Sequence, residues 1–211
     1  MKRIVTLILL ICMVFCLTGC KSSDYKQAVS QYENGNLDQA RESFKALGDY
    51  NDAQDYLKKI DQDQYRQALK LFTDGNYEEA LALFQKVSTF SDSDKYIIAI
   101  TNPEKLIKEA CEEKDSWSVK RQVSALNDSG IKTTIGNKDC DIKFDSDTRT
   151  FACVKATTIT WQLSGKNYAH KLYDGYVGHF EGIRVVIDDT TSIDGLDDDA
   201  DVNGFWKEYW K

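Results

Sequence analysis

Residues 65–84 read YRQALKLFTDGNYEEALALF, and residues 25–44 read YKQAVSQYENGNLDQARESF. The two stretches start 40 positions apart, and the alignment of 25–60 on 65–100 contains 10 identities in 36 positions. Self-similarity at a fixed spacing is typical of repeat architectures, in which each unit buries its apolar face against the next. The sequence therefore predicts two tandem units within residues 25–102.

Each repeat has the pattern of two helices joined by a tight turn. In the second copy, apolar residues within 65–72 follow the spacing of one helical face, and a second such stripe occupies 77–87. Gly75 lies between the stripes and supplies a turn conformation that other residues avoid. Asp52 and Asp92 then predict the N-cap of a short third helix in each unit.

The spacing of Ala68, Gly75, Tyr77, Ala80 and Phe84, repeated 40 residues earlier, resembles the tetratricopeptide repeat. That family has a period of about 34 residues, and the extra residues here form the predicted third helix. The units resemble those of secreted and lipid-anchored proteins of Gram-positive bacteria. The resemblance implies a solenoid segment that presents a surface to other proteins or glycans, so we expect an envelope protein to bind the repeats. Most of the aromatic stripe is expected to be helical core.

The second half of the chain changes its apolar period from 3.6 to 2. Residues 103–130 predict capping and bridging helices, with Pro103 in a first helical turn. From 131 to 211 polar residues alternate with β-branched and aromatic ones, which is typical of strands. Turns are expected at 146–147, 163–167, 173–176 and 181–182. The predicted fold class is α+β: a helical tetratricopeptide-like segment, then a small antiparallel β-meander with a packed helix.

Two cysteines test the first predicted hairpin. If 146–147 forms a two-residue loop, opposite residues have numbers that sum to 293, which places Cys140 opposite Cys153. The pair falls at a non-hydrogen-bonded position with Cα atoms about 4.5 Å apart, at the short end of the range for disulfides. We therefore predict a Cys140–Cys153 disulfide, with two buried free thiols as the alternative. Cys111 remains without a predicted partner.

The first twenty residues indicate export. A basic start precedes an apolar run of 14 residues, 4–17, which is too short to span a bilayer comfortably. Residues 17–20, LTGC, resemble the lipobox of bacterial lipoproteins. The resemblance implies a signal peptide at 1–19, lipidation of Cys20, a tether at 20–24 and a location on the extracytoplasmic face of the cell membrane. The alternatives are an ordinary cleaved signal or an uncleaved anchor.

Charge and motifs exclude several function classes. With 27 basic and 34 acidic residues, the net charge of −7 disfavours nonspecific nucleic-acid binding, which depends on Lys and Arg. The sequence contains no Walker loop, dinucleotide Gly motif, Gly-x-Ser-x-Gly or His-Glu-x-x-His. We expect the two histidines, His170 and His179, to be half-exposed strand residues. Pairing of Cys111 with a histidine, and zinc binding by Cys and His, are the alternatives.

An acidic segment near the end contains one partial metal motif. Asp199, Asp201, Asn203 and Gly204 match positions 1, 3, 5 and 6 of an EF-hand loop, which aims oxygens at calcium. Position 12, a bidentate Glu in that motif, is Trp210 here. No cofactor is therefore expected, and calcium is the alternative. The aromatic residues that follow predict a terminal helix docked on the sheet, or an exposed aromatic patch.

These patterns together predict a membrane-anchored lipoprotein that acts without catalysis, as a protein-interaction or scaffold module of the cell envelope. The main alternative is a small cell-wall enzyme or enzyme inhibitor that uses the C-terminal β domain. A solute-binding lipoprotein is a third hypothesis, disfavoured because such receptors usually have two large lobes.

Overall fold

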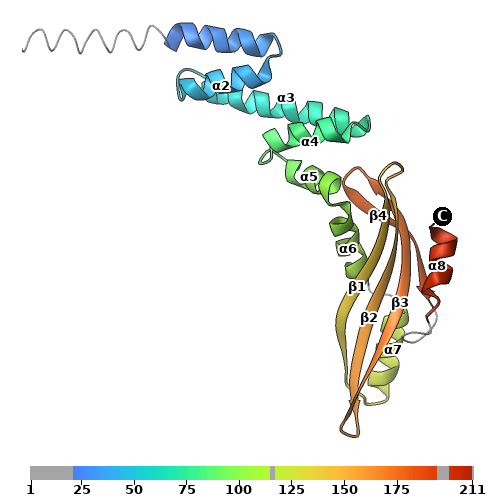
Figure 1. The fold of residues 1–211 in the computed structure, drawn as a ribbon. Helices are drawn as coiled ribbons and strands as arrows, with labels where there is room; N and C mark the ends of the chain where they lie inside the picture. Colours follow the sequence, from blue (N-terminus) through green and yellow to red (C-terminus); the bar gives the residue numbers. More distant parts are fainter. Residues whose placement is uncertain (1–20, 115–116, 194–199, 211) are drawn as a thin grey trace, which may run out of the picture. The chain divides into compact units, whose positions relative to one another are not determined.

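The computed structural model describes residues 21–114, 117–193 and 200–210. The chain divides into two compact units between Ile97 and Ile98, the first built of helices and the second built around a sheet (Figure 1). The α+β prediction is confirmed. Within the described ranges, every helix is too short or too polar to cross a membrane.

The helices of the first part follow the 40-residue repeat. They are a helix over 21–33, α2 (Leu37–Leu47), α3 (Ala53–Thr73), α4 (Tyr77–Lys86) and α5 (Ser93–Thr101). The backbone repeats in detail, since Gly35 and Gly75 have φ of 76° and 82°, and Asn51 and Ser91 have φ of 50° and 51°. Positive φ suits glycine and is tolerated by asparagine in turns, so both copies of each turn use the same conformation.

The prediction of a separate third helix in the first repeat is wrong. Helix α3 runs unbroken and joins that segment to the first helix of the second repeat. The linking residues 61–64 contain neither Gly nor Pro, so nothing ends the helix there. Asp52 occupies the N-cap position, but its carboxylate accepts a hydrogen bond from the Tyr25 hydroxyl instead of capping α3.

The aromatic stripes are the core of the repeats, as expected for most of them. The rings of Phe44 and Tyr56 stack with centroids 4.6 Å apart, and those of Phe84 and Tyr96 stack at the same distance 40 residues later. Both phenylalanines are fully buried. Each pair adds roughly 0.5–1.5 kcal/mol to the stability gained from burial alone.

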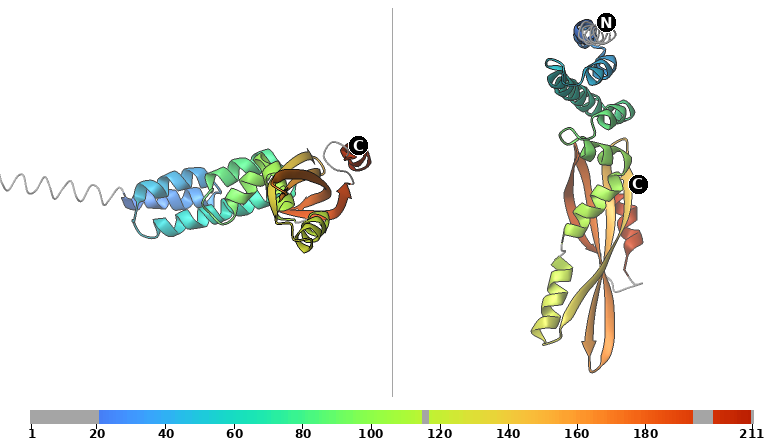
Figure 2. Two further views of the ribbon diagram at one scale, coloured as in Figure 1. Left: turned by 90° about the horizontal axis from the view of Figure 1, so that it is seen from below. Right: turned by 90° about the vertical axis from the view of Figure 1, so that its left-hand side faces the viewer.

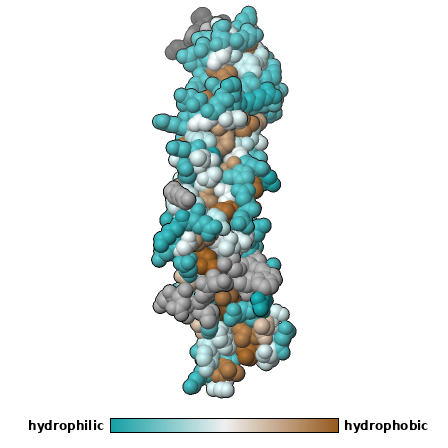
Figure 3. All heavy atoms as spheres, turned by 90° about the vertical axis from the view of Figure 1, so that its right-hand side faces the viewer, coloured by the Kyte–Doolittle hydropathy of each residue, from teal (hydrophilic) through white to brown (hydrophobic). Residues whose placement is uncertain are grey.

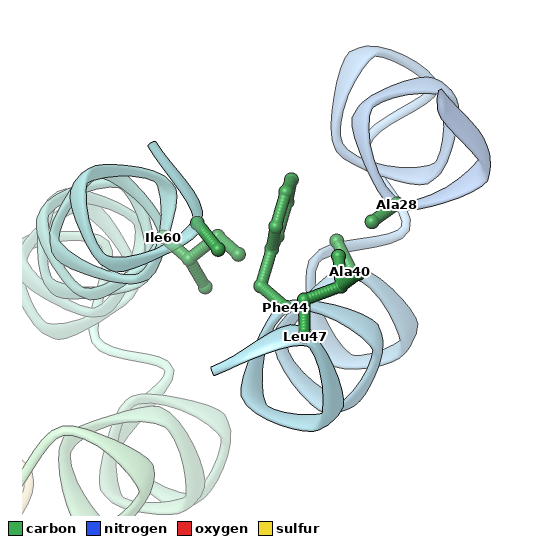
Figure 4. Packing of buried hydrophobic residues seen from close by; sticks show 6 residues of the cluster. Ala28, Ala40, Phe44, Leu47 and Ile60 are labelled. Atoms are coloured by element: carbon green, nitrogen blue, oxygen red, sulfur yellow. The ribbon is translucent and has the colours of Figure 1, made fainter. Parts of the chain in front are cut away.

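Small residues allow the helices of the first repeat to pack closely. Ala28 and Ala40 are fully buried. Figure 4 shows the Phe44 side chain extending from α2 into the space between Ile60 on α3 and Ala28 on the first helix. A larger residue at either alanine would push these helices apart, because interiors are close-packed.

The second part contains a four-stranded antiparallel sheet in the order β1-β2-β3-β4. The strands are β1 (Thr133–Asp145), β2 (Thr150–Leu163), β3 (Lys166–Glu181) and β4 (Arg184–Ile193). Helices α6 (Pro103–Glu113) and α7 (Trp117–Asp128) cover one face, and α8 (Val202–Tyr209) covers part of the other (Figure 2). The predicted meander and the docking of the terminal helix are both confirmed.

The alternation of β2 explains this two-sided packing. Cys153 and Ile159 point to the face covered by α6 and α7, where Ile107 of α6 is fully buried. Val154, of the opposite parity, packs against Phe205 of α8. Successive side chains of a strand point to opposite faces, so one strand supports two separate cores.

The first hairpin loop has four residues instead of the predicted two. Asp145 pairs with Thr150, so opposite positions on β1 and β2 sum to 295 and not to 293. The Asp145 carboxylate accepts hydrogen bonds from the backbone N–H groups of Asp147 (2.8 Å) and Thr148 (3.3 Å), and Arg149 has φ of 54°. This local hydrogen bonding favours the longer loop.

The turn predicted at 173–176 is also wrong, because these residues lie in the middle of β3. Gly175 is there for another reason: a Cβ at this position would lie 2.2 Å from Cε2 of Phe205. Glycine therefore permits the close approach of α8 to the sheet. The other two predicted turns are confirmed, at 164–165 between β2 and β3 and at 182–183 between β3 and β4.

Candidate functional site

An apolar patch lies at one end of the sheet. Among the described residues, the large apolar side chains that are exposed are those of Ile135, Leu163 and Tyr168, at 43%, 47% and 40%. The register places Tyr168 opposite Trp161, and Trp161 opposite Thr133. Leu163 is two positions from Trp161 on β2, and Ile135 is two positions from Thr133 on β1. Residues two apart on a strand point to the same face, so both lie on the face of Trp161 and Tyr168. We call Ile135, Trp161, Leu163 and Tyr168 the hairpin-end patch.

The patch is supported from beneath by the core of the sheet. The Trp161 ring stacks on Tyr168 with centroids 5.7 Å apart and packs against the cluster of Val119 on α7, Ile159 and Leu172. The centroid of the His170 ring, on β3, lies 4.8 Å from that of the Trp161 ring, on β2. Figure 1 shows the β2–β3 hairpin extending past the end of α7, which leaves its last residues uncovered by that helix.

The surroundings of the patch are basic, although the chain as a whole is acidic. Residues 130–138 and 158–173 contain four lysines and no Asp or Glu. These lysines are Lys132, Lys138, Lys166 and Lys171. Lys166 is opposite Leu163 and shares the face of the patch, whereas Lys171 is opposite Thr158 and lies on the other face. The border of the patch at Lys166 is therefore complementary to an acidic surface.

A polar border adjoins the patch. An open hollow of about 870 Å³ at the hairpin end is lined by Trp161, Leu163 and Tyr168 of the patch. Polar residues that alternate with them along the strands also line it, among them Thr134, Thr160, Gln162 and Asn167. On the face shown in Figure 3, hydrophobic residues likewise form small areas separated by hydrophilic ones. An apolar centre with a polar rim is the usual anatomy of a protein-binding surface.

A buried lysine holds the end of α6. Lys155 is 1% exposed, and its Nζ donates to the carbonyl oxygens of Cys111 (3.2 Å) and Lys114. The Tyr176 hydroxyl donates to the same Lys114 carbonyl (3.4 Å), and Lys138 Nζ donates to that of Glu112 (2.9 Å). The last carbonyls of a helix have no partner within the helix, so these side chains cap α6 from the sheet.

The charge of Lys155 is partly compensated across the sheet. Desolvation lowers its pKa, and the carboxylate of Asp174, fully buried on the opposite position of β3, acts in the other direction. The sequence analysis did not predict this pair. Lys155 is two positions from Cys153 on β2 and so points to the same covered face, and this spacing could have indicated a buried lysine.

The predicted position of Cys140 directly opposite Cys153 is wrong. The longer loop places Cys140 opposite Lys155, and Cys153 opposite Ile142. The structure has Cys111, Cys140 and Cys153 as free thiols. They are nevertheless neighbours, because Cys111 and Cys153 belong to one buried cluster and Cys140 packs against it.

The proximity of the thiols shifts the pKa values of Cys140 and Cys153 in opposite directions. The pKa of Cys153 is raised strongly by its hydrogen bonds to Cys111 and Cys140 and by burial. The pKa of Cys140 is lowered, mainly by its hydrogen bond with Cys153. Over the described residues, the structure holds no group of three or more His, Cys, Asp or Glu side chains arranged for a metal ion.

The two histidines lie apart on β3. Nine residues separate them, or about 30 Å of strand. His179 Nδ1 lies 2.8 Å from Asp188 Oδ2, and Nε2 lies 3.8 Å from Glu181 Oε1. The hydrogen bond to Asp188 is the main cause that raises the pKa of His179. Both partners are carboxylates, so this group resembles an exposed ion-pair cluster more than a nucleophile and its base.

The residues of the calcium motif are only partly described. Asp199 lies outside the described residues, and Asn203 lies in the first turn of α8. Asp201 is the N-cap of that helix, and its Oδ1 accepts from the N–H of Gly204 at 2.8 Å. A Cβ on Gly204 would lie 2.2 Å from Asp201 Oδ2, so the cap by itself accounts for this glycine. Calcium binding stays a prediction.

Cys20 and the rest of the lipobox also lie outside the described residues. Comparisons of the chain with models of protein families, with curated proteins and with solved structures find no match. The function is therefore argued from the chain's own residues.

Proposed function

We propose that this chain is a lipid-anchored, non-catalytic binding module of the cell envelope, and that its β unit binds an acidic partner protein through the hairpin-end patch. The observation that carries the proposal is the gathering of Ile135, Leu163 and Tyr168 on one face at one end of the sheet. Exposed apolar patches of this kind, bordered by polar residues, mark interaction sites. The lipobox-like residues 17–20 support the anchor and the location on the extracytoplasmic face.

The apolar anchors favour the sheet over the repeats as the binding surface. Binding energy usually depends on a few aromatic and aliphatic side chains at the centre of an interface. In the repeats, Phe44 and Phe84 are buried in the core, and the large apolar residues exposed in the described chain all belong to the sheet. A contribution of the repeats as spacer or second contact is compatible with this proposal.

The chemistry of the partner follows from the border of the patch. Lys166 attracts acidic side chains, while Leu163 and Tyr168 require an apolar contact at the centre. Electrostatic complementarity of this type mainly increases the association rate and weakens with salt. The expected partner is therefore a protein with an apolar spot surrounded by Asp and Glu.

The anchor is tested separately from the binding surface. Cells that express the full chain are labelled with a fatty acid, and the membrane fraction is compared with that of Cys20→Ser. The proposal expects label and membrane retention in the native chain and loss of both in Cys20→Ser. Equal labelling of the two chains would refute lipidation at Cys20.

The binding surface is tested by photo-crosslinking in the same membranes. A photoreactive residue is placed at position 168, and in a control chain at the exposed position of Glu78 on α4. The proposal expects an acidic protein to be captured only from position 168. Its purified form should bind Tyr168→Ser about 30-fold more weakly, the effect of losing about 2 kcal/mol at a central contact.

A matched control guards against a general effect of charge or folding. Lys166→Glu, at the border of the patch, should weaken binding, whereas Lys207→Glu on α8 should leave it unchanged. Equal binding of Tyr168→Ser and the native chain, or capture from position 78 alone, would move the binding surface away from the hairpin end.

A second candidate function, a small cell-wall enzyme or inhibitor, is favoured by the His179–Asp188 hydrogen bond. Asp188 also lines an open hollow of about 350 Å³ together with Tyr209 and Trp210. In this case His179→Ala would abolish a hydrolytic activity on cell-wall material while leaving the circular dichroism spectrum unchanged. The binding-module proposal expects no such activity in either chain.

A further inference from the structure

Three cysteines from three different elements belong to one cluster in the β unit. Cys111 is on α6, Cys140 on β1 and Cys153 on β2. Cys111 and Cys153 are fully buried, whereas Cys140 is half-buried. Cys153 is the link between the others, because it shares the buried cluster of Cys111 and lies diagonally to Cys140 on the same face of the sheet.

Cys140 is the member of the group that solvent can reach. It lines an open hollow of about 430 Å³ formed between the start of α6 and β1. Its neighbours in this hollow are Asn102, Glu104, Lys105, Lys108, Asp141 and Ile142. The hollow is too small for a protein domain and suits a small molecule.

We propose that Cys111, Cys140 and Cys153 form a thiol–disulfide exchange site, in which a low-molecular-weight disulfide reacts at Cys140 and the resulting bond is passed through Cys153 to Cys111. The end product ties α6 covalently to β2. This site is separate from the hairpin-end patch, and it involves Cys111, for which the sequence predicted no partner.

The first two steps oxidise the protein and reduce the external disulfide. The Cys140 thiolate attacks one sulfur of the external disulfide, whose S–S bond breaks, and the first external thiolate leaves and takes up a proton. Cys153 then gives up its proton and attacks Cys140 Sγ, releasing the second external thiol. Two protein thiols become one disulfide, and one external disulfide becomes two thiols.

The third step moves the bond without further oxidation. Cys111 gives up its proton and attacks Cys153 Sγ, the Cys140–Cys153 bond breaks, and Cys140 leaves as a thiolate. Cys140 is the best leaving group because solvent reaches it and stabilises its thiolate, whereas Cys111 and Cys153 are buried. The same property makes Cys140 the most reactive of the three toward the external disulfide.

The geometry favours a shared bond at Cys153 over one fixed cross-strand pair. Cys140 is opposite Lys155 and so lies diagonally to Cys153 on the same face. Diagonal neighbours in a sheet have Cα atoms about 7–8 Å apart, beyond the usual limit of about 6.8 Å for a relaxed disulfide. A Cys140–Cys153 bond is therefore strained, and attack by Cys111 relieves it.

The experiment exploits the positions of the basic residues. Trypsin cleavage after Lys and Arg places each cysteine in its own peptide: 109–114, 139–143 and 150–155. The folded, reduced full chain is mixed with glutathione disulfide, samples are quenched with acid over time, free thiols are alkylated, and the peptides are identified by mass spectrometry.

The expected order of products is specific. Glutathione appears first on peptide 139–143, then 139–143 becomes linked to 150–155, and finally 109–114 becomes linked to 150–155. Independent glutathione adducts without linked peptides, or no reaction, would overturn the proposal. A reaction that stops at the pair 139–143 with 150–155 would overturn the transfer to Cys111.

Variants assign the steps. In Cys153→Ser the glutathione adduct should persist on Cys140 with no linked peptides. In Cys140→Ser the bond between Cys111 and Cys153 should form about tenfold more slowly, because the accessible thiolate is missing. Cys111→Ala, with folding checked by circular dichroism, should accumulate the Cys140–Cys153 pair. An unchanged rate of bond formation in Cys140→Ser would show that Cys140 is not the entry point.

Discussion

Substituting Gly175 by alanine should destabilise the β unit through a single contact. The added Cβ would lie 2.2, 2.5 and 2.9 Å from Cε2, Cδ2 and Cζ of Phe205, whereas ordinary contact begins at 3.4 Å. The ring must therefore retreat by about 1.2 Å, the difference between 3.4 and 2.2 Å. Because Phe205 is only 6% exposed and packs against Ala152, Val154 and Ile193, the overpacking should cost about 2–3 kcal/mol.

A urea titration monitored by tryptophan fluorescence measures this loss of stability in the β unit. All four tryptophans, at positions 117, 161, 206 and 210, follow Ile97, so the signal reports on the β unit and not on the repeats. Gly136→Ala is the matched control, because its Cβ would approach the Thr158 carbonyl to 3.4 Å, within ordinary contact. The control should change the unfolding free energy by less than about 0.5 kcal/mol.

A double-mutant cycle decides whether Phe205 is the cause. Phe205→Ala alone should cost about 3–5 kcal/mol, and adding Gly175→Ala to it should cost almost nothing more because the ring is gone. Additive costs, or equal midpoints for Gly175→Ala and Gly136→Ala, would refute the argument that this glycine exists to admit α8.

Three further predictions concern buried and capping groups. Lys155→Met should destabilise the β unit by about 3 kcal/mol, because it removes a buried positive charge opposite Asp174 and the hydrogen bonds that cap α6; the same fluorescence assay measures it. The NMR titration of His179 should give a pKa above 6.5, and Asp188→Asn should lower it. Because the folded-state pKa is raised, this contribution to stability is complete below pH 6.5 and is lost as the pH rises through the folded-state pKa. Asp201→Ala should cost about 1 kcal/mol and increase amide exchange in α8, because the N-cap is lost.

The repeats could be predicted from sequence because their signals are local. Gly35 and Gly75 occupy the same turn in both copies, and the apolar spacing between them is that of a helix. What the spacing could not show is the continuity of α3. That depends on the absence of a helix-ending residue in 61–64, and Asp52 was interpreted as the start of an independent helix.

The errors in the sheet arose where a short pattern has two physical meanings. Asp174-Gly175 is a common turn pair, but here Asp174 faces a buried lysine and Gly175 admits a ring from a helix 30 residues later. Neither contact can be read from neighbouring residues. The loop at 146–149 differs because the Asp145 side chain binds the loop backbone, and this moved the register of the cysteines by two positions.

In the candidate sites, too, local patterns could be predicted and contacts between distant elements could not. The alternation expected over 131–211 is that of strands, but the exposure of Leu163 depends on where α7 ends relative to the hairpin. The cysteines of β1 and β2 were expected to be neighbours, and they are, although not as a direct pair. The approach of Cys111 depends on the docking of α6 on the sheet, which no local pattern specifies.

Helix α3 has a consequence for how the repeats respond to pulling. Its first half completes the first repeat and its second half begins the second, within one rod of 21 residues, or about 31 Å. A pulling force applied at the N-terminal end of the repeats would therefore act on a continuous hydrogen-bonded helix between them, with no connecting loop. The two repeats should yield together in one force step, and a cut between them would sever a helix instead of separating two independent pieces.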